Sequence, residues 1–284
     1  MRLFVFGLGY SAQHFIDRYA ERFKAIAGTV RTPENQQALQ GSRCTALRFG
    51  PDQSDPQIAK QIATADVLLV SVPPGAAGDP ALAAFGPQIA ASGLKRIVYL
   101  SSIGVYADHR GHWIDETATM SGEGRRRLRI DAEAAWLAVP GQRTSVLRIA
   151  GIYGPGRNAL RNLKAGTARR IVKPGQVFNR IHVEDIARTI DAALDCERVG
   201  IWNVCDDEPG PPQDVIAYAA KLMGIALPPD IPFAEAEMSP MARSFYATSN
   251  RVSNARWKGE LGIRLAYPTY RDGLTTLWLG GEGS

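Results

Sequence analysis

The chain of 284 residues is long enough to bury a full core. Its composition, 45% hydrophobic and 21% charged, is that of a folded protein and excludes a disordered one. The net charge of +5 comes from scattered basic residues. No apolar run reaches the roughly 18 residues of a membrane span. The cysteines do not have the spacing of a zinc-binding motif. We therefore expect a cytoplasmic protein with no metal, no membrane and no nucleic-acid partner.

The first half of the chain alternates apolar runs with helix-length segments. A helix is predicted over 11–23, where Phe15, Tyr19 and Phe23 are spaced by four. The apolar runs predict strands over 2–7, 24–31, 66–74, 96–106 and 144–154. Near-continuous apolar strands separated by helices are typical of a parallel sheet that is covered on both faces. The pattern predicts an α/β protein with a Rossmann-type doubly wound parallel sheet.

The pattern of alternating apolar runs and helical segments ends after residue 154, where segments rich in Gly, Pro and Arg predict loops. A further strand is predicted over 200–209 and a helix over 213–224, ending at Gly224. We expect a dinucleotide-binding domain over 1–165 and 180–208, and a small substrate lobe over 166–179 and 209–284. Within this lobe, the polar and basic segment 239–256 suits an anionic ligand, but a solvated surface loop explains it equally well.

A glycine turn links the first strand to the first helix. "FGLGYSAQHF" presents Gly7, Gly9 and Ala12 in a G-x-G-x-x-A pattern. Glycines there allow a tight turn and a close approach of the backbone to a pyrophosphate, which lies on the helix N-terminus. A plain strand-to-helix turn is the alternative interpretation.

The end of the second predicted strand bears on the choice of cofactor. NAD sites usually place an Asp or Glu there, whereas this chain has Thr29 and Arg31, with no acid before Glu34. An arginine can pair with a 2′-phosphate, which a carboxylate would repel. We expect NADP rather than NAD, although Arg31 could instead be a surface residue on a turn.

Several segments together resemble the extended short-chain dehydrogenase/reductases, also called the NAD-dependent epimerase/dehydratase superfamily. They are "GLGYSA", "VYLSSIGVYAD", "IDET", "SVLRIAGIYGPGR", "RIHVEDIA" and "WNVCDDEP". They occur in the family's order and cover roughly residues 1 to 210. The resemblance implies a Rossmann domain with a small C-terminal substrate lobe.

The resemblance also implies catalytic positions, and here the chain departs from the family. The family uses a Ser or Thr after the fifth strand and a Tyr-x-x-x-Lys helix; Ser102 takes the serine position, although it could merely cap the strand end. The "AE" at 132–133 puts Arg125 at the tyrosine position and Arg129 at the lysine position. Arginine gives up no proton at neutral pH and cannot replace a tyrosinate. Our hypothesis is that Arg125 binds an anionic group and that Arg129 holds the cofactor ribose.

The other arginines of this helix fit a charged surface. Arg127 can pair with Asp131, and Arg129 could alternatively pair with Glu133, each four residues on. Arg126 is likewise expected on a solvated face.

Two residues are candidates for a substitute acid or base, because the family's equivalents border the substrate pocket. Tyr106 is more often a wall residue, and His182 is usually structural or in contact with substrate. Arg157 could contact a substrate phosphate or pair with an acid in its loop. Glu184 and Asp185 resemble the family's fold-stabilising acids. The predicted cofactor site comprises Gly7, Leu8, Gly9, Tyr10, Ser11, Thr29, Arg31, Val72, Arg129 and Ile152.

These observations lead to two functional hypotheses. The first is an atypical NADP(H)-dependent oxidoreductase or epimerase-like enzyme that acts on a carbonyl or carbinol carbon near Ser102, in a small, anionic or sugar-nucleotide substrate. The second is a non-catalytic NADP(H)-binding sensor or regulatory protein, which senses NADP(H) or presents its C-terminal lobe to a partner. Ile103 and Gly104 stand where the family's 4,6-dehydratases carry an acidic pair, which argues against that subclass.

Overall fold

The computed structural model describes residues 1–141 and 144–283, and its contacts divide the chain into two compact units. Unit 1 consists of Met1–Val105, Met120–Arg148 and Ile186–Trp202. Unit 2 consists of Tyr106–Thr119, Ile149–Asp185 and Asn203–Ser284. Residues 106–119, 149–165, 180–185 and 203–208 fall in unit 2 by contacts, whereas the sequence analysis placed them in the dinucleotide-binding domain. The predicted domain bounds stay a prediction.

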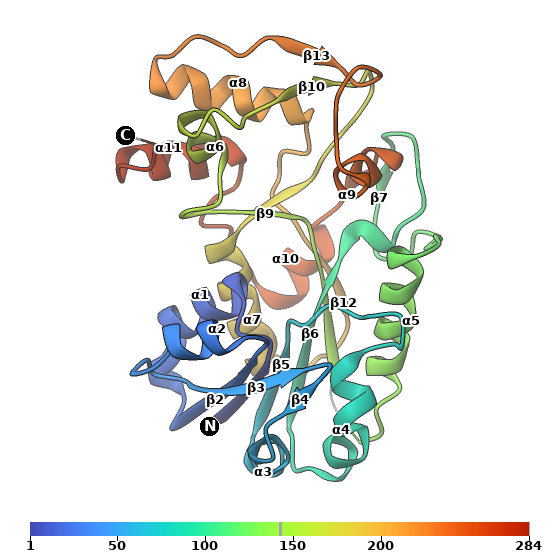
Figure 1. Cartoon of the computed structure of the whole chain (residues 1–284). Coiled ribbons are helices and arrows are strands. Elements are labelled where there is room, and N and C mark those ends of the chain that lie inside the picture. Colours follow the sequence, from blue (N-terminus) through green and yellow to red (C-terminus); the bar gives the residue numbers. More distant parts are fainter. Residues whose placement is uncertain (142–143, 284) are drawn as a thin grey trace. The chain divides into compact units, whose positions relative to one another are not determined.

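Unit 1 is built on an eight-stranded sheet in the order β12-β8-β6-β5-β1-β2-β3-β4 (Figure 1). Its strands are β1 (Arg2–Phe6), β2 (Ala25–Val30), β3 (Thr45–Gly50), β4 (Gln53–Ser54), β5 (Val67–Val70), β6 (Arg96–Ser102), β8 (Thr144–Ile149) and β12 (Ile201–Val204). The central pairs β2–β1, β1–β5 and β5–β6 are parallel, and the short β4 pairs antiparallel with β3. The predicted α/β fold with a parallel sheet is confirmed.

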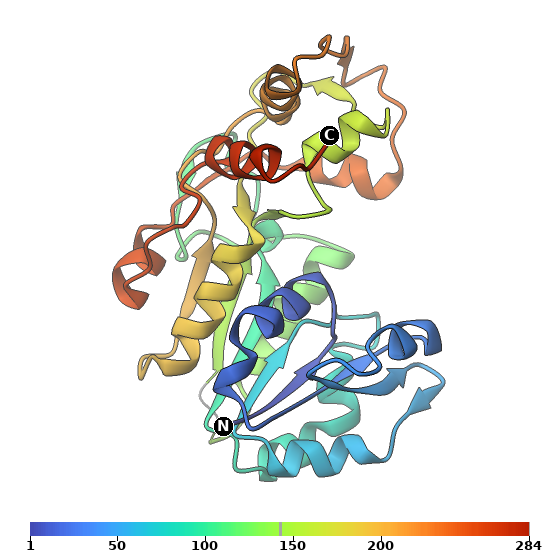
Figure 2. The ribbon, with the colours of Figure 1, turned by 90° about the vertical axis from the view of Figure 1, so that its left-hand side faces the viewer.

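Helices cover both faces of this sheet, as a doubly wound fold requires (Figure 1). Helices α3 (Gln57–Thr64), α4 (Pro80–Ala91) and α5 (Arg125–Leu137) pack on one face. Helices α1 (Tyr10–Tyr19) and α7 (Val183–Asp195) lie on the other (Figure 2). Arg22, which follows α1, forms an ion pair with Asp195 of α7 (2.6 Å). The short α2 (Pro33–Ala38) follows β2.

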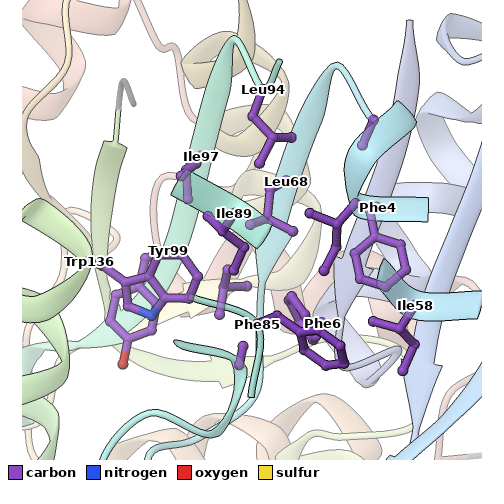
Figure 3. Packing of buried hydrophobic residues seen from close by; sticks show 14 of the residues in the cluster. Phe4, Phe6, Ile58, Leu68, Phe85, Ile89, Leu94, Ile97, Tyr99 and Trp136 are labelled. Atoms are coloured by element: carbon purple, nitrogen blue, oxygen red, sulfur yellow. The ribbon is translucent and has the colours of Figure 1, made fainter. Parts of the chain in front are cut away.

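The core under α3, α4 and α5 is apolar and rich in aromatic rings (Figure 3). Tyr99 of β6 stacks on Trp136 of α5 with ring centroids 6.0 Å apart. The ring centroids of Phe6 in β1 and Phe85 in α4 are 5.8 Å apart. Because Tyr99 and Trp136 are fully buried, this packing fixes α5 against β6.

Several predicted elements are shorter than the sequence pattern indicated; the strands predicted over 66–74 and 200–209, for example, end at Val70 and Val204. The predicted helix over 11–23 ends at Tyr19 and continues as a 3-10 turn, Ala20–Arg22, although Phe15 still packs on Phe23 (6.0 Å). The predicted strand over 96–106 ends at Ser102, followed by the 3-10 turn η2 (Ile103–Val105). The run over 144–154 divides into β8 and β9 (Gly151–Tyr153). In the last two cases the apolar run continues past the last residue of the regular element, whereas the helix is followed by the charged residues Glu21 and Arg22.

Unit 2 contains three two-stranded parallel ladders. They are β9 with β11 (Arg180–His182), β10 (Arg170–Val172) with β13 (Asp230–Pro232), and β7 (Trp113–Ile114) with β14 (Arg251–Val252). Its helices are α6 (Ala159–Lys164), α8 (Pro212–Met223), α9 (Pro240–Ser244), α10 (Ala255–Leu261) and α11 (Tyr270–Leu279), and a 3-10 turn spans Phe245–Ala247. Helix α8 ends at Gly224 with φ 65°, as predicted. Over 1–141 and 144–283, no helix is both long and apolar enough to cross a bilayer.

Candidate functional site

The turn between β1 and α1 is held tightly within unit 1. Gly7 has φ +93°, which other residues rarely adopt, and a Cβ on it would come within 3.0 Å of the Val72 side chain. The Gly7 N–H donates to the Thr29 hydroxyl (2.9 Å), and the Leu8 N–H donates to the Thr29 carbonyl (2.8 Å). Thr29 and Val72, both predicted cofactor-site residues, therefore shape the turn itself.

Gly9 begins α1 and leaves the end of the helix open. It makes no side-chain cap, the first helical turn carries no acidic residue, and a Cβ on Gly9 would meet nothing within 4 Å. Tyr10 is half-buried and Ser11 is buried in that first turn. The Gln13 side chain donates to the Leu8 carbonyl (2.7 Å) and braces the turn. Since a helix N-terminus attracts anions and nothing crowds Gly9, these residues fit a diphosphate.

Gly28 of β2 packs against this turn, and the sequence analysis missed it. A Cβ on Gly28 would lie 2.8 Å from the Leu8 side chain and 2.9 Å from the Val5 carbonyl oxygen. Only glycine lets Leu8 pack this closely on β2. A glycine inside an apolar strand often marks a close backbone approach, and that signal could have identified it.

Arg31 follows β2 directly and is exposed. Its side chain lies beside β3, where a Cβ on Gly50 would be 3.7 Å from the Arg31 Cγ. No carboxylate within 1–141 or 144–283 pairs with Arg31. The nearby acid, Glu34, has its pKa lowered by its own backbone N–H, by the Thr32 hydroxyl and by the Arg48 cation. Arg31 thus stands at the strand end as an unpaired cation.

Ser102 is the last residue of β6 and is half-buried. Its hydroxyl accepts a hydrogen bond from the Gly104 N–H (3.1 Å). The predicted alternative, a hydroxyl that caps the strand end, therefore describes part of its role. The second lone pair and the hydroxyl proton can still serve a ligand.

A buried ion pair lies directly behind Ser102. Arg148 of β8 donates to both carboxylate oxygens of Glu133, at 2.8 Å and 3.3 Å, and Ser101 donates to the same carboxylate. The Arg148 and Glu133 side chains are only 1% and 3% exposed. We call Ser101, Glu133 and Arg148 the clamp, because they join β6, α5 and β8. The sequence analysis gave Arg148 no role, although an arginine inside an apolar strand must find a partner when it is buried.

The arginines of α5 have different environments. Arg127 pairs with Asp131 (2.9 Å), which confirms that prediction, and Arg126 reaches the Ser121 carbonyl (3.4 Å). The alternative pairing of Arg129 with Glu133 is wrong, because Glu133 is buried in the clamp. Arg129 is half-buried and donates instead to the Leu100 carbonyl of β6 (3.3 Å). Arg125, the first residue of the helix, is exposed.

Tyr106 and His182 lie inside unit 2. The Tyr106 side chain is buried, and its hydroxyl donates to the Asn203 side-chain oxygen (2.7 Å). The His182 Nδ1 accepts from the Glu184 N–H (3.1 Å), and its ring lies 4.0 Å from the Tyr267 ring centroid. These contacts favour structural roles for both residues. Their predicted part in catalysis stays a prediction.

The remaining predicted residues of unit 2 lie on β9, in the turn that follows it and in the first turn of α7. Ile152 of β9 pairs with Ile181 of β11 and is half-buried. Arg157 is exposed, and its backbone pairs with Gly154 in a tight turn. Asp185 is fully buried and accepts from the backbone N–H groups of Ala266 (2.7 Å) and Tyr267 (3.0 Å). This is the fold-stabilising role predicted for it.

The segment 248–254 connects neighbouring segments of unit 2 through hydrogen bonds. Asn179 donates to the Asn250 carbonyl (2.9 Å) and accepts from the Val252 N–H (2.9 Å), while the Asn250 side chain donates to the Ala107 carbonyl (2.9 Å). Asn250 and Val252 are buried. For these residues the solvated-loop interpretation is wrong, since their polar groups satisfy the backbone of neighbouring segments.

Solved structures of similar shape define the class of fold. The human epimerase family protein SDR39U1, solved with NADPH, is 17% identical with a TM-score of 0.74, over 97% of this chain and 98% of its own. MoeE5 in complex with UDP-glucuronic acid and NAD is 16% identical with a TM-score of 0.77, over 97% of each chain. The chain has the fold of the extended short-chain dehydrogenase/reductases, as its motifs predicted. At these identities the likeness extends to the fold alone.

A nearer relative establishes the family. The chain belongs to the same family as a functionally unknown conserved protein from Silicibacter pomeroyi DSS, which is 46% identical with a TM-score of 0.91 over 99% of both chains. No protein-family model matches the chain.

Two curated proteins are also similar in sequence. A 3-diazoavenalumate denitrifying reductase from Streptomyces sp is 30% identical over 142 residues, which are 45% of this chain and only 45% of that protein. Protein YeeZ from Escherichia coli (strain K12) is 26% identical over 238 residues, 79% of this chain and 84% of its own.

Proposed function

We propose that unit 1 binds a nicotinamide dinucleotide and prefers NADP(H) to NAD(H). The turn from Gly7 to Gly9 carries this proposal, because it opens an uncapped helix beside a glycine with free space around it. Two proteins of the same fold were solved with NADPH and with NAD. The unpaired Arg31 suits the 2′-phosphate that distinguishes NADP from NAD.

Several of the predicted cofactor residues then have roles that their positions in unit 1 support. The first-turn N–H groups of α1 bind the diphosphate, and Val72 closes the other side of the turn. Arg129, which uses one nitrogen on the Leu100 carbonyl, keeps further N–H donors for the ribose hydroxyls. A bound nicotinamide dinucleotide supplies a hydride donor or acceptor.

We further propose an oxidoreductase that acts on a carbonyl or carbinol carbon. Ser102 would orient the substrate oxygen at the end of β6. The likeness to a reductase over part of the chain supports an oxidoreductase, and the position of Ser102 at the end of β6 carries the assignment to a carbonyl or carbinol carbon. Because arginine releases no proton at neutral pH, neither Arg125 nor Arg129 serves as the acid or base, and the proton comes from another group or from water.

A non-catalytic sensor of NADP(H) is the second candidate function. Two observations favour it: arginine replaces the tyrosine of the family's motif, and the Tyr106 hydroxyl is engaged by Asn203. Nucleotide binding would be the same in both cases, so turnover has to separate them.

Replacing Arg31 by alanine is expected to weaken NADPH binding about 10- to 100-fold, the usual effect of losing a hydrogen bond between charged groups. NADH affinity should change less than about twofold, since NADH has no 2′-phosphate. Fluorescence titration with each nucleotide measures both constants. Arg43→Ala, another exposed arginine of unit 1, should leave both unchanged. Equal losses for NADPH and NADH, or no loss, would contradict the preference for NADP(H).

A screen for turnover distinguishes the enzyme from the sensor. NADPH consumption is followed with a panel of aldehydes, ketones and sugar nucleotides. For the enzyme, we expect turnover with at least one substrate and a loss of about 10-fold or more in Ser102→Ala, whereas Ser54→Ala, an exposed serine on β4, keeps full activity. Tight NADPH binding with no turnover across the panel would favour the sensor.

A further inference from the structure

Arg125 differs from the other three arginines at the start of α5. Arg126, Arg127 and Arg129 each have a partner, a carbonyl or a carboxylate. Arg125 has none among residues 1–141 and 144–283. Its guanidinium is exposed and keeps all of its N–H donors.

Two hydrogen bonds fix where Arg125 lies in unit 1. Arg129 donates to the Leu100 carbonyl (3.3 Å), and the Ser121 N–H donates to the Val105 carbonyl (3.2 Å). Residue 129 lies beside residue 100 and residue 121 lies beside residue 105, so the segments 121–129 and 100–105 run in opposite directions. Position 125 is midway along the first segment. Arg125 therefore flanks the segment that holds Ser102.

The clamp makes this alignment rigid. Glu133 lies two helical turns beyond Arg125, and Ser101 and Arg148 both hold its carboxylate. Helix α5 also packs directly on β6 and η2. Arg125 thus lies at the start of a helix that the buried carboxylate of Glu133 ties to β6 and β8.

Helix stability does not account for Arg125. The first turn of α5 carries three arginines and no acid. Cations at a helix N-terminus oppose the helix dipole and cost about 0.3–1 kcal/mol each at low salt. An arginine here without an ion pair is therefore free to bind an external anion.

We propose that Arg125 binds the anionic group of the substrate, a carboxylate or a phosphate monoester, beside Ser102. The planar guanidinium can give such a group two parallel hydrogen bonds. Its role is to hold and orient the substrate, with no transfer of a proton. The inference rests on the proposed function, since it places the substrate of that same site, and it restricts the substrate to organic anions.

Arginine footprinting with phenylglyoxal, read by peptide mass spectrometry, tests the proposal. The probes are inorganic phosphate and benzoate, each compared with chloride at equal ionic strength. We expect saturating probe to slow modification of Arg125 about fivefold or more, as bidentate binding would. Arg127, exposed on the same helix, should change less than about twofold, because the Asp131 carboxylate already occupies its guanidinium (2.9 Å). The two probes separate phosphate from carboxylate recognition.

The same experiment reports on the proposed function separately. Protection of Arg31 by NADPH and not by NADH tests cofactor binding, whereas protection of Arg125 by phosphate or benzoate tests the substrate-anion site. An Arg125 that reacts equally fast with and without the probes overturns the inference even if Arg31 is protected. Equal protection of Arg125 and Arg127 overturns it as well, because it would report charge screening alone.

A pair of variants gives a second measurement. Calorimetric titration with the protective anion should show binding that is lost in Arg125→Gln and kept in Arg127→Gln. Arg125 is exposed, so Arg125→Gln should keep the thermal midpoint of the parent protein. A folded Arg125→Gln that binds the anion like the parent protein rules the site out.

Discussion

Replacing Glu133 by alanine is expected to lower the free energy of unfolding by about 3–5 kcal/mol, because the change leaves a buried guanidinium without its carboxylate. Arg148 is only 1% exposed, and two of its nitrogens lie 2.8 Å and 3.1 Å from the same Glu133 oxygen. The Ser101 hydroxyl loses its acceptor as well. Urea unfolding followed by tryptophan fluorescence measures the change, since Trp136 is buried on the same helix.

The matched control is the exposed ion pair on the same helix. Asp131→Ala breaks the pair with Arg127 and should cost less than about 1 kcal/mol, since solvent screens it. The double variant Glu133→Leu with Arg148→Met should recover much of the loss, because apolar residues of similar volume often replace a buried pair without cost. If Glu133→Ala costs no more than Asp131→Ala, the clamp is not a source of stability.

The parallel sheet could be predicted from the sequence because its central strands are apolar on both faces. The runs at 2–7, 24–31 and 66–74 contain β1, β2 and β5, which lie side by side. Strand β3 was missed: "TALRFG" is polar at Thr45 and Arg48 and lies near the edge of the sheet. An edge strand needs less apolar surface, so its pattern is weak.

The glycine turn could be predicted because its requirements are local. Gly7 needs a positive φ and Gly9 needs open space, and both follow from spacing within a few residues. The clamp could not be predicted in the same way. Glu133 and Arg148 are 15 residues apart and belong to different elements, so only the packing of α5 against β8 brings them together.

The resemblance to a family indicated which residues to examine in unit 2, but it could not say what they touch. Tyr106 was predicted to border the substrate pocket, and its hydroxyl bonds to Asn203, 97 residues away. Asn250 was assigned to a polar segment, and it satisfies the backbone at Ala107 and His109. Such contacts depend on long-range packing, which motifs do not encode.

Raising the pH from 5 to 9 is expected to destabilise the protein through Asp206 of unit 2. This side chain is 2% exposed, its Oδ1 accepts from the Glu208 N–H (3.2 Å), and its Oδ2 has no partner among the described residues. Burial raises the pKa of Asp206 to about 8. The Arg180 cation and the Glu208 N–H offset only part of this rise in pKa, and the Glu208 and Asp207 carboxylates add to it. The folded protein therefore keeps this carboxyl protonated at neutral pH.

The direction of this pH dependence follows from the pKa of Asp206 in the folded and in the unfolded protein. The unfolded chain loses the Asp206 proton near pH 4, whereas the folded chain holds it until about pH 8. Stability from this group is therefore greatest below pH 4, falls as the pH rises and is constant above the folded pKa. Between pH 5 and pH 9 the expected loss is on the order of 3–4 kcal/mol.

Urea unfolding of Asp206→Asn at both pH values isolates this contribution, because the amide stays neutral. The variant should match the parent protein within about 1 kcal/mol at pH 5 and exceed its stability by several kcal/mol at pH 9. Asp207→Asn is the control: this exposed neighbour pairs with Lys258 (2.9 Å), and its loss should cost less than about 1 kcal/mol at either pH. If Asp206→Asn is equally destabilising at pH 5 and pH 9, the carboxyl is already ionised in the folded protein and acts as the counter-charge of Arg180.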